Sequence, residues 1–176
     1  RSEGKSTMER HLLAISPKAR LLSVDYGKNP KDYQAAPIKI TFRYEIPDYA
    51  LKGEGEMFFR PMVMNNLYNQ VRSYMWIDTS VENRKYGFKD ACSRLVELDE
   101  TVQLPAGYKL VSAVKDETMQ GVGADFEGSL VQKGNKVLLH NRLALKKRVY
   151  EASDWESFRN AVNAHKAYGE YLVIKK

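Results

Sequence analysis

The stretch EASDWESFRNAVNAHKAYGEYLVIKK, residues 151–176, predicts one helix followed by one short apolar strand. Ser153 and Glu156 fit the S-x-x-E capping box, in which the Ser hydroxyl accepts from the N3 amide and the Glu side chain reaches back to the Ser amide. Asp154 adds a negative charge at the positive end of the helix dipole. Gly169 stands where a left-handed C-cap is expected, and the last residues then return as a strand.

The predicted helix has one apolar side, formed by Trp155, Phe158, Val162 and His165 at helical spacing. A helix of about 14 residues is marginal alone, so this side must pack on something apolar. Burial of the Trp and of the Phe contributes about 2–3 kcal/mol each. We therefore expect the helix to cover an edge or an end of a sheet. The alternative, that Trp155 or His165 lines a ligand site, stays open.

Most of the chain before this helix has patterns typical of β-strands. The clearest is 38–46, where Ile, Phe and Tyr alternate with Lys, Thr, Arg and Glu, as on a strand with one buried face. Further strands are expected at 4–15, 20–26, 56–60, 93–104, 108–114, 124–132 and 136–150. Gly and Pro predict a turn at 27–37, and Lys-Gly-Asn at 133–135 predicts a tight hairpin.

Short turns between strands, without a βαβ rhythm, favour antiparallel sheets. The expected fold class is mainly β: an antiparallel β-sandwich with one C-terminal α-helix and a terminal strand. We expect residues 1–176 to form a single domain, because neither half is rich enough in core positions to stand alone. Residues 62–90 fit either a short helix or an ordered loop, and a weak internal boundary there remains the alternative.

The composition is that of an ordinary globular protein. Of the 176 residues, 43% are apolar and 28% are charged, which argues against disorder. No apolar run approaches the roughly 18 residues that a membrane-spanning helix needs. Because the sequence begins with Arg1 rather than Met, we expect a fragment or a processed chain, so the lack of a signal peptide carries no information.

The net charge of +6 is modest, with 28 basic and 22 acidic residues. The densest basic run is Lys146-Lys147-Arg148, preceded by Arg142. Nucleic-acid-binding faces combine basic stripes with aromatic stacking platforms, and this run stands alone at a strand end. We interpret it as a solvated strand end and expect no nucleic-acid partner.

The residues able to do chemistry are scattered. The histidines, His11, His140 and His165, lie far in sequence from one another and from Cys92, so neither a metal site nor a cofactor is expected. A nucleophilic Cys92 would need a His and an orienting carboxylate or amide beside it, and KDACSRL shows neither a helix N-terminus nor a glycine turn. We expect a small apolar residue near a strand start. An enzyme based on Cys92 is the least favoured alternative.

Three other clusters have two readings each. GVGADFEG (121–128) lacks a phosphate-binding spacing and predicts a turn. Glu97 and Asp99, followed by Glu100, share a strand face, which indicates a solvent-facing edge more strongly than a calcium site. The aromatic residues Tyr68, Tyr74 and Trp76 are candidates for a carbohydrate-binding groove, with packing in the core or in a loop as the alternative.

Several segments, in order, resemble one known domain. EGKSTMERHLLAIS resembles its opening strand, APIKITFRYEIPDYALKGEGEMFFRP its central hairpin, ETVQLPAGYKL its L-P-x-G-Y strand, and residues 135–176 its final strand, helix and strand. This is the C-terminal β-sandwich domain of bacterial multidomain proteins of unknown function that have a transglutaminase-like, papain-like middle domain. The resemblance covers nearly the whole chain.

The resemblance implies an accessory domain without a catalytic site, because the family's catalytic Cys, His and Asp lie in the middle domain and no residue here matches them. It implies a transglutaminase-like core in the same polypeptide as the partner, and an envelope protein of Gram-negative bacteria, placed in the periplasm or at the cell surface. The alternative function is a cell-surface module that binds a glycan or a protein, with Tyr68, Tyr74 and Trp76 as its site.

Overall fold

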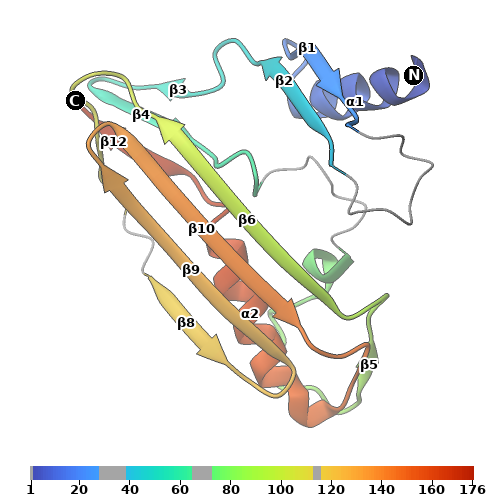
Figure 1. The fold of residues 1–176 in the computed structure, drawn as a ribbon. Coiled ribbons are helices and arrows are strands. Elements are labelled where there is room, and N and C mark those ends of the chain that lie inside the picture. The colour runs from blue at the N-terminus through green and yellow to red at the C-terminus, as the bar shows by residue number, and fades with distance from the viewer. Residues whose placement is uncertain (1, 28–38, 65–72, 113–115) are drawn as a thin grey trace. The chain divides into compact units, whose positions relative to one another are not determined.

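The computed structural model describes residues 2–27, 39–64, 73–112 and 116–176 (Figure 1). The chain divides into two compact units, Arg1–Tyr49 and Ala50–Lys176. The single domain expected from the sequence stays a prediction. No helix within the described ranges is long and apolar enough to cross a membrane.

The N-terminal unit contains α1 (Ser2–Ile15), β1 (Arg20–Asp25) and β2 (Thr41–Glu45). The strand predicted at 4–15 is therefore wrong. Met8 and Leu12 lie one helical turn apart, and both are buried. Lys5 lies 3.8 Å from Glu9, also one turn away. Burial of two apolar side chains at helical spacing outweighs the partial alternation in this segment.

β1 and β2 pair antiparallel, which confirms the strands predicted around 20–26 and 38–46. Phe42 and Tyr44 are half-buried on one side of β2 and stack with their ring centroids 5.6 Å apart. The residues that alternate with them, Thr41, Arg43 and Glu45, are exposed, as the alternation predicts. Most of the turn predicted at 27–37 lies outside the described residues.

A four-stranded antiparallel sheet, ordered β6-β10-β9-β8, forms the centre of the C-terminal unit. Its strands are β6 (Arg94–Gln103), β8 (Glu117–Gln120), β9 (Ala124–Lys133) and β10 (Lys136–Leu145). A two-residue turn joins β9 to β10, and Gly134 in that turn has a φ of 61°, which glycine adopts without strain. The predicted hairpin is confirmed. The short β8 has no clear alternation and was not predicted.

The remaining strands are short. They are β3 (Leu51–Lys52), β4 (Glu56–Phe59), β5 (Phe88–Lys89), β7 (Lys109–Leu110), β11 (Val149–Tyr150) and β12 (Leu172–Lys175). One sheet has the order β3-β4-β12-β7, and β5 pairs with β11. The predictions for 56–60 and for the terminal strand are confirmed by β4 and β12. The strand predicted over 108–114 shrinks to β7 among its described residues.

The strand predicted over 136–150 is interrupted after Leu145. The Lys146 amide donates to the Gly123 carbonyl at 3.0 Å, and the Asp90 amide donates to the Arg148 carbonyl at 2.9 Å. These hydrogen bonds to loops replace the pairing of β10 with its neighbouring strands. β10 therefore ends at Leu145, and a separate short strand, β11, follows it. The alternation in the sequence does not report this change of partner.

A 3₁₀ turn (Ala152–Asp154) leads into α2 (Trp155–Ala167), which packs on β9 and β10 (Figure 1). Its buried residues are Trp155, Phe158, Ala161, Val162, Ala164 and His165. They face the buried side of the sheet, where Phe126 and Leu143 lie. The predicted fold class, mainly β with antiparallel sheets, a C-terminal helix and a final strand, is confirmed.

Both predicted helix caps are wrong in detail. Ser153 and Glu156 are exposed, and Asp154 Oδ2 instead accepts from the Glu151 amide at 2.8 Å. The capping interaction therefore begins two residues earlier, because the 3₁₀ turn precedes the helix. Gly169 does not have a positive φ, and its amide donates to the Lys166 carbonyl at 2.9 Å in a further turn.

Candidate functional site

Residues 73–89 run beside α2, and we name them the α2-flanking segment. Three hydrogen bonds fix it to the helix: between Tyr74 Oη and His165 Nε2 at 3.2 Å, from Lys166 Nζ to Thr79 Oγ1 at 3.2 Å, and from Trp155 Nε1 to the Val81 carbonyl at 2.9 Å. Its early residues thus lie near the end of α2 and Val81 near its start. The segment therefore runs antiparallel to the helix.

Local chemistry shapes the middle of the segment. Asp78 Oδ1 accepts from the Ser80 amide at 2.9 Å and from its hydroxyl at 2.6 Å, and these hydrogen bonds lower the pKa of the Asp78 carboxyl. This is the Asx-turn geometry that Asp and Ser favour. Burial lowers the pKa of the Lys166 ammonium, and the nearby Asp78 carboxylate partly offsets that effect.

An aromatic cluster holds the end of the segment. The Phe88 ring stacks on Tyr150 at 4.7 Å between centroids and meets Trp155 and Phe158 edge-on at 5.5 Å and 4.9 Å. The Arg84 guanidinium lies 4.8 Å from the centroids of both Phe88 and Trp155. Such stacked and edge-on pairs favour one fixed arrangement of the rings.

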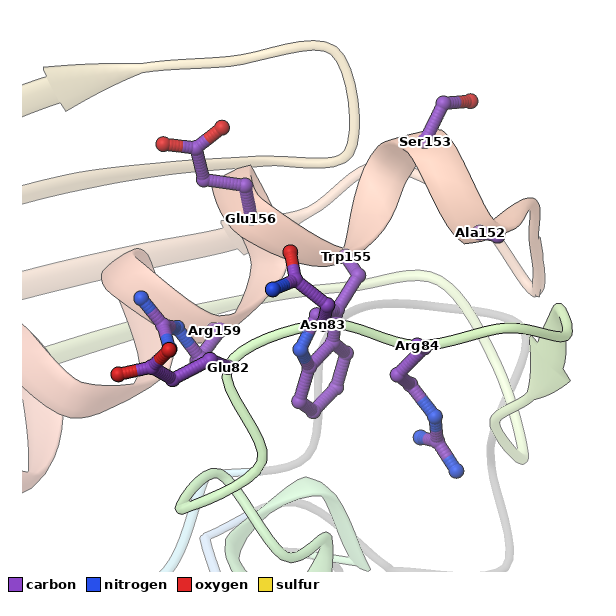
Figure 2. Close-up of a pocket in the computed structure, with 8 residues that line it drawn as sticks. All are labelled: Glu82, Asn83, Arg84, Ala152, Ser153, Trp155, Glu156 and Arg159. Atoms are coloured by element: carbon purple, nitrogen blue, oxygen red, sulfur yellow. The ribbon is translucent and has the colours of Figure 1, made fainter.

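A pocket of about 390 Å³ opens between the segment and the start of α2 (Figure 2). It is lined by Glu82, Asn83, Arg84, Ala152, Ser153, Trp155, Glu156 and Arg159. In Figure 2 the Trp155 indole points from the helix towards the loop that carries Asn83 and Arg84. Arg159 Nε is buried and makes no hydrogen bond in the described structure. The pocket therefore combines carboxylates, guanidinium groups and an amide.

A buried polar network lies beneath the other end of the segment. His165 Nδ1 lies 2.6 Å from Asn141 Oδ1, and His165 Nε2 is the atom paired with Tyr74. The Asn141 oxygen only accepts, so Nδ1 carries the proton of this hydrogen bond. All three residues are fully buried. Both ring nitrogens of His165 therefore make hydrogen bonds inside the core, and this arrangement stabilises the fold.

The three aromatic residues predicted as a ligand site do not share one environment. Tyr74 is completely buried, whereas Trp76 is 76% exposed. Tyr68 lies outside the described residues. Within the described structure, the Tyr74 ring is therefore closed to a ligand and the Trp76 ring is accessible to one.

Cys92 lies two residues before β6, near a strand start as predicted, and it is exposed. His140 pairs with Asp99, with Nδ1 2.8 Å from Oδ1, and His165 pairs with Asn141 and Tyr74. In the described ranges, no three His, Cys, Asp or Glu side chains gather as they would around a metal ion.

The acidic residues of β6 lie on two faces. Glu97 and Asp99 share the outer face, as predicted, and Glu97 Oε1 accepts from Arg142 Nε at 3.1 Å. Glu100 lies on the opposite face and accepts from the amides of Met62 and Val63 at 3.1 and 3.0 Å. Burial raises the pKa of the Glu100 carboxyl, and these two hydrogen bonds partly oppose that shift.

Two lysines of the basic run are paired rather than simply solvated. Lys146 Nζ lies 2.7 Å from Asp125 Oδ1, and Lys147 Nζ lies 2.7 Å from Asp154 Oδ1. The lysine hydrogen bonds lower the pKa of both carboxyls. The run thus links β10 to the start of β9 and to the start of α2.

Sequence reasoning did not identify the α2-flanking segment, because it has no apolar period. Two local features of the sequence could have indicated an ordered segment here: the Asp78-x-Ser80 spacing of an Asx turn, and Gly87. A Cβ on Gly87 would lie 2.5 Å from the Tyr150 carbonyl oxygen, so glycine is needed for this close approach.

Comparison with known proteins agrees with this fold. A family model described as "Domain of Unknown Function with solved-structure structure (DUF3858)" matches residues 55–173. Among curated proteins, none matches this sequence. A crystal structure of a "putative protease" from Parabacteroides distasonis has a similar fold, with a TM-score of 0.54 and 15% sequence identity. The match spans 68% of this chain but only 23% of that chain.

Proposed function

We propose that this chain, which belongs to the DUF3858 family of domains of unknown function, is a non-catalytic accessory domain that packs against or presents a transglutaminase-like core in a larger envelope protein. The observation that carries the proposal is the size of the structural match. The part of this fold that matches spans 23% of a longer chain that is described as a "putative protease". The remainder of a longer chain would contain the catalytic core.

The interior of the domain supports an accessory role. The two ring nitrogens of His165 bind Asn141 and Tyr74 within the core. A general base must reach a nucleophile or a substrate proton, and a sealed imidazole reaches neither. His140 lies on the outer face of the sheet and pairs with Asp99. By resemblance, we place the parent protein in the periplasm or at the cell surface.

Covalent labelling of the full-length polypeptide tests the proposal. An epoxide inhibitor directed at papain-like cysteines is expected to modify a Cys outside residues 1–176, as located by mass spectrometry. The matched variant Cys92→Ser is expected to label as strongly as the wild type. Modification at Cys92, lost in Cys92→Ser, would show that this domain carries the reactive thiol, and the proposal would then be rejected.

A second function, a surface module for a glycan or a protein, is favoured by one observation. Trp76 exposes 76% of its surface although it is a large apolar residue. Exposed aromatic rings are typical of binding sites, because ring stacking and apolar contact contribute much affinity per residue. Loss of binding in Trp76→Ala on a panel of purified polysaccharides would support the glycan form of this function.

A further inference from the structure

The two four-stranded sheets meet at one end of the C-terminal unit. There the β9–β10 turn contacts the chain between β6 and β7, because the Leu104 amide donates to the Asn135 carbonyl at 2.8 Å. Gln132 adds to this contact: its Oε1 accepts from the Leu110 amide at 2.7 Å, and its Nε2 donates to the Tyr108 carbonyl at 3.4 Å. Segments that are distant in sequence therefore lie side by side at this end.

The end of β12 lies in the same place. Lys175 in β12 is paired with Lys109 in β7, and a Cβ on Gly107 would lie 3.9 Å from the Lys176 side chain. The Lys176 amide donates to the Gly55 carbonyl in the β3–β4 turn at 3.1 Å. Figure 1 shows the C-terminus beside this end of β9 and β10. These contacts join the turns and strand ends into one continuous surface.

This surface is rich in lysine. Four of its lysines are exposed and make no ion pair within the described ranges: Lys109, Lys133, Lys136 and Lys176. The adjoining β3–β4 hairpin carries two carboxylates, Glu54 and Glu56. Glu56 pairs with Lys175, and Glu54 is matched in charge by Lys52 of the same hairpin. The charge of the four exposed lysines is therefore not cancelled by these neighbours.

The lysines at the opposite end of β10 differ from these four. Lys146 Nζ lies 2.7 Å from Asp125 Oδ1, and Lys147 Nζ lies 2.7 Å from Asp154 Oδ1. A strand of this length separates its two ends by roughly 30 Å. Lysine charge is thus neutralised within the fold at one end and left free for an external anion at the other.

An uncharged turn lies among the four lysines. Pro105, Ala106 and Gly107 are exposed, and the Tyr108 amide closes the turn by donating to the Pro105 carbonyl at 3.2 Å. Gly107 has a φ of 84°, which glycine adopts without strain. A small turn without a carboxylate can approach a flat anionic surface closely, because no negative charge has to be brought up to it.

We propose that this end of the domain, the turn 105–107 with Lys109, Lys133, Lys136 and Lys176, docks on a lipid bilayer that contains anionic lipids. We name it the lysine tip. Each lysine near such a bilayer is attracted to the headgroups, and several lysines together give stable attachment. The proposal goes beyond the accessory role and does not depend on it, since that role concerns packing within one polypeptide.

The residue types favour a bilayer over a nucleic acid or an acidic protein. The basic residues of the lysine tip are all lysines, which act as point charges, whereas arginine supplies the bidentate contacts typical of phosphate and carboxylate recognition. Surfaces for single-stranded nucleic acids also present aromatic rings for stacking. Tyr108, the aromatic residue next to the turn, is half-buried. A bilayer needs neither feature, because its headgroups offer diffuse charge.

Sedimentation of the full-length polypeptide with vesicles tests the proposal. Vesicles of phosphatidylglycerol mixed with phosphatidylcholine are expected to bind the wild type, whereas vesicles of phosphatidylcholine alone are not. Binding is expected to disappear between about 0.1 M and about 1 M salt, because the screening length falls from about 10 Å to about 3 Å.

Paired substitutions locate the binding surface. Lys133→Ala with Lys136→Ala is expected to weaken binding to the anionic vesicles about 30-fold, the effect of losing two lysines near the headgroups. Lys89→Ala with Arg148→Ala is the matched control, because it removes the same charge from exposed residues beside β5 and β11, beyond the other end of β10. The control pair is expected to bind like the wild type. Since all four side chains are exposed, thermal midpoints are expected to stay unchanged.

A tryptophan placed in the turn gives a readout that does not depend on charge. Ala106→Trp is expected to show a shift of its fluorescence emission to shorter wavelength when anionic vesicles are added, relative to the wild type, because the indole enters the headgroup region. Val122→Trp is the control, since Val122 is exposed between β8 and β9, away from the lysine tip. Its emission is expected to stay unchanged.

Each contrary outcome overturns the proposal. A wild type that does not bind the anionic vesicles, or binds both kinds equally, would reject docking by charge. Equal losses in the two paired variants would show that net charge, rather than the lysine tip, governs binding. Binding to a single-stranded oligonucleotide without binding to vesicles would make the lysine tip a nucleic-acid surface. None of these outcomes bears on the accessory role, which the covalent labelling tests separately.

Discussion

The two sides of β10 share one backbone but lie in different environments. One side carries Asn141, Leu143 and Leu145, which are fully buried beneath α2 and its neighbours. The other side carries His140 and Arg142, whose side chains contact carboxylates of β6 near solvent. The comparison teaches that apolar packing on the first side supplies most of the stability, whereas charge pairs on the second supply little.

The most severe way to disturb the buried side is to remove a ring from its partner helix. Phe158 is completely buried and contacts Phe88, Tyr150 and Trp155. Phe158→Ala should lower the free energy of unfolding by about 3–5 kcal/mol, because it leaves a cavity that rigid neighbours cannot fill. Urea denaturation followed by circular dichroism measures the loss.

Tyr86→Ala is the matched control for that experiment, since it removes an exposed ring and is expected to change stability by less than about 0.5 kcal/mol. A loss below about 1 kcal/mol in Phe158→Ala would contradict the assignment of α2 as a main contributor to the core.

Overpacking the same interface is expected to have the second largest effect. A Cβ on Gly128 would lie 2.6 Å from ring atoms of both Phe126 and Tyr168. Gly128→Ala should therefore cost about 1–3 kcal/mol, whereas Ser129→Ala on the opposite side of β9 should be nearly neutral. Burial raises the pKa of Tyr168 to about 12. If the ring is displaced towards solvent, its ionisation, followed by ultraviolet absorbance, should shift to lower pH.

Equal stability of Gly128→Ala and Ser129→Ala would show that the helix moves away from the sheet without cost. In that case, β9 would not support the conclusion that the buried side of the sheet contributes more stability than the exposed side.

These buried contacts explain which parts of the fold are predictable from sequence. The stripe Trp155, Phe158, Val162 and His165 predicted α2, and alternation predicted β6, β9 and β10, because each pattern is the direct record of one buried side. The same logic failed at 4–15, where Met8 and Leu12 are the only strong signal and alternation among polar residues misled the assignment.

The candidate site was largely hidden from sequence analysis, for a physical reason. The position of the α2-flanking segment depends on single side-chain bonds, such as Tyr74 to His165 across 91 residues, and such pairings leave no periodic pattern. Tyr74 and Trp76 are neighbours in one 3₁₀ turn, yet one is buried and the other exposed. Only the tertiary contacts distinguish them.

A smaller effect, dependent on pH, is expected at the start of α2. Asp154 accepts from Lys147 Nζ at 2.7 Å and from the Glu151 amide at 2.8 Å, and the lysine contact is the main reason that the pKa of its carboxyl is lowered. A lowered folded-state pKa stabilises the fold above the unfolded-state pKa, and this stabilisation disappears as the pH falls through the folded-state value.

Asp154→Asn removes the charge and keeps the shape, so it should cost about 1 kcal/mol at neutral pH, the difference between charged and neutral hydrogen bonds. The difference should shrink as the pH falls through the folded-state pKa of the wild-type carboxyl. Denaturation over a series of acidic pH values measures this. A difference that stays constant over the series would show that the asparagine variant alters packing instead of charge.

The smallest effect is expected on the outer side of β10, and it measures the other half of the comparison. The Arg142–Glu97 pair has side chains 38% and 53% exposed, with Nε and Oε1 3.1 Å apart. A double-mutant cycle with Arg142→Ala and Glu97→Ala should give a coupling of about 0.2–1 kcal/mol, because water screens the charges. The coupling should fall further in 1 M salt, where the screening length is about 3 Å. A coupling that approaches the loss in Phe158→Ala would mean that charge contributes as much as apolar packing, and the two sides of β10 would no longer differ in kind.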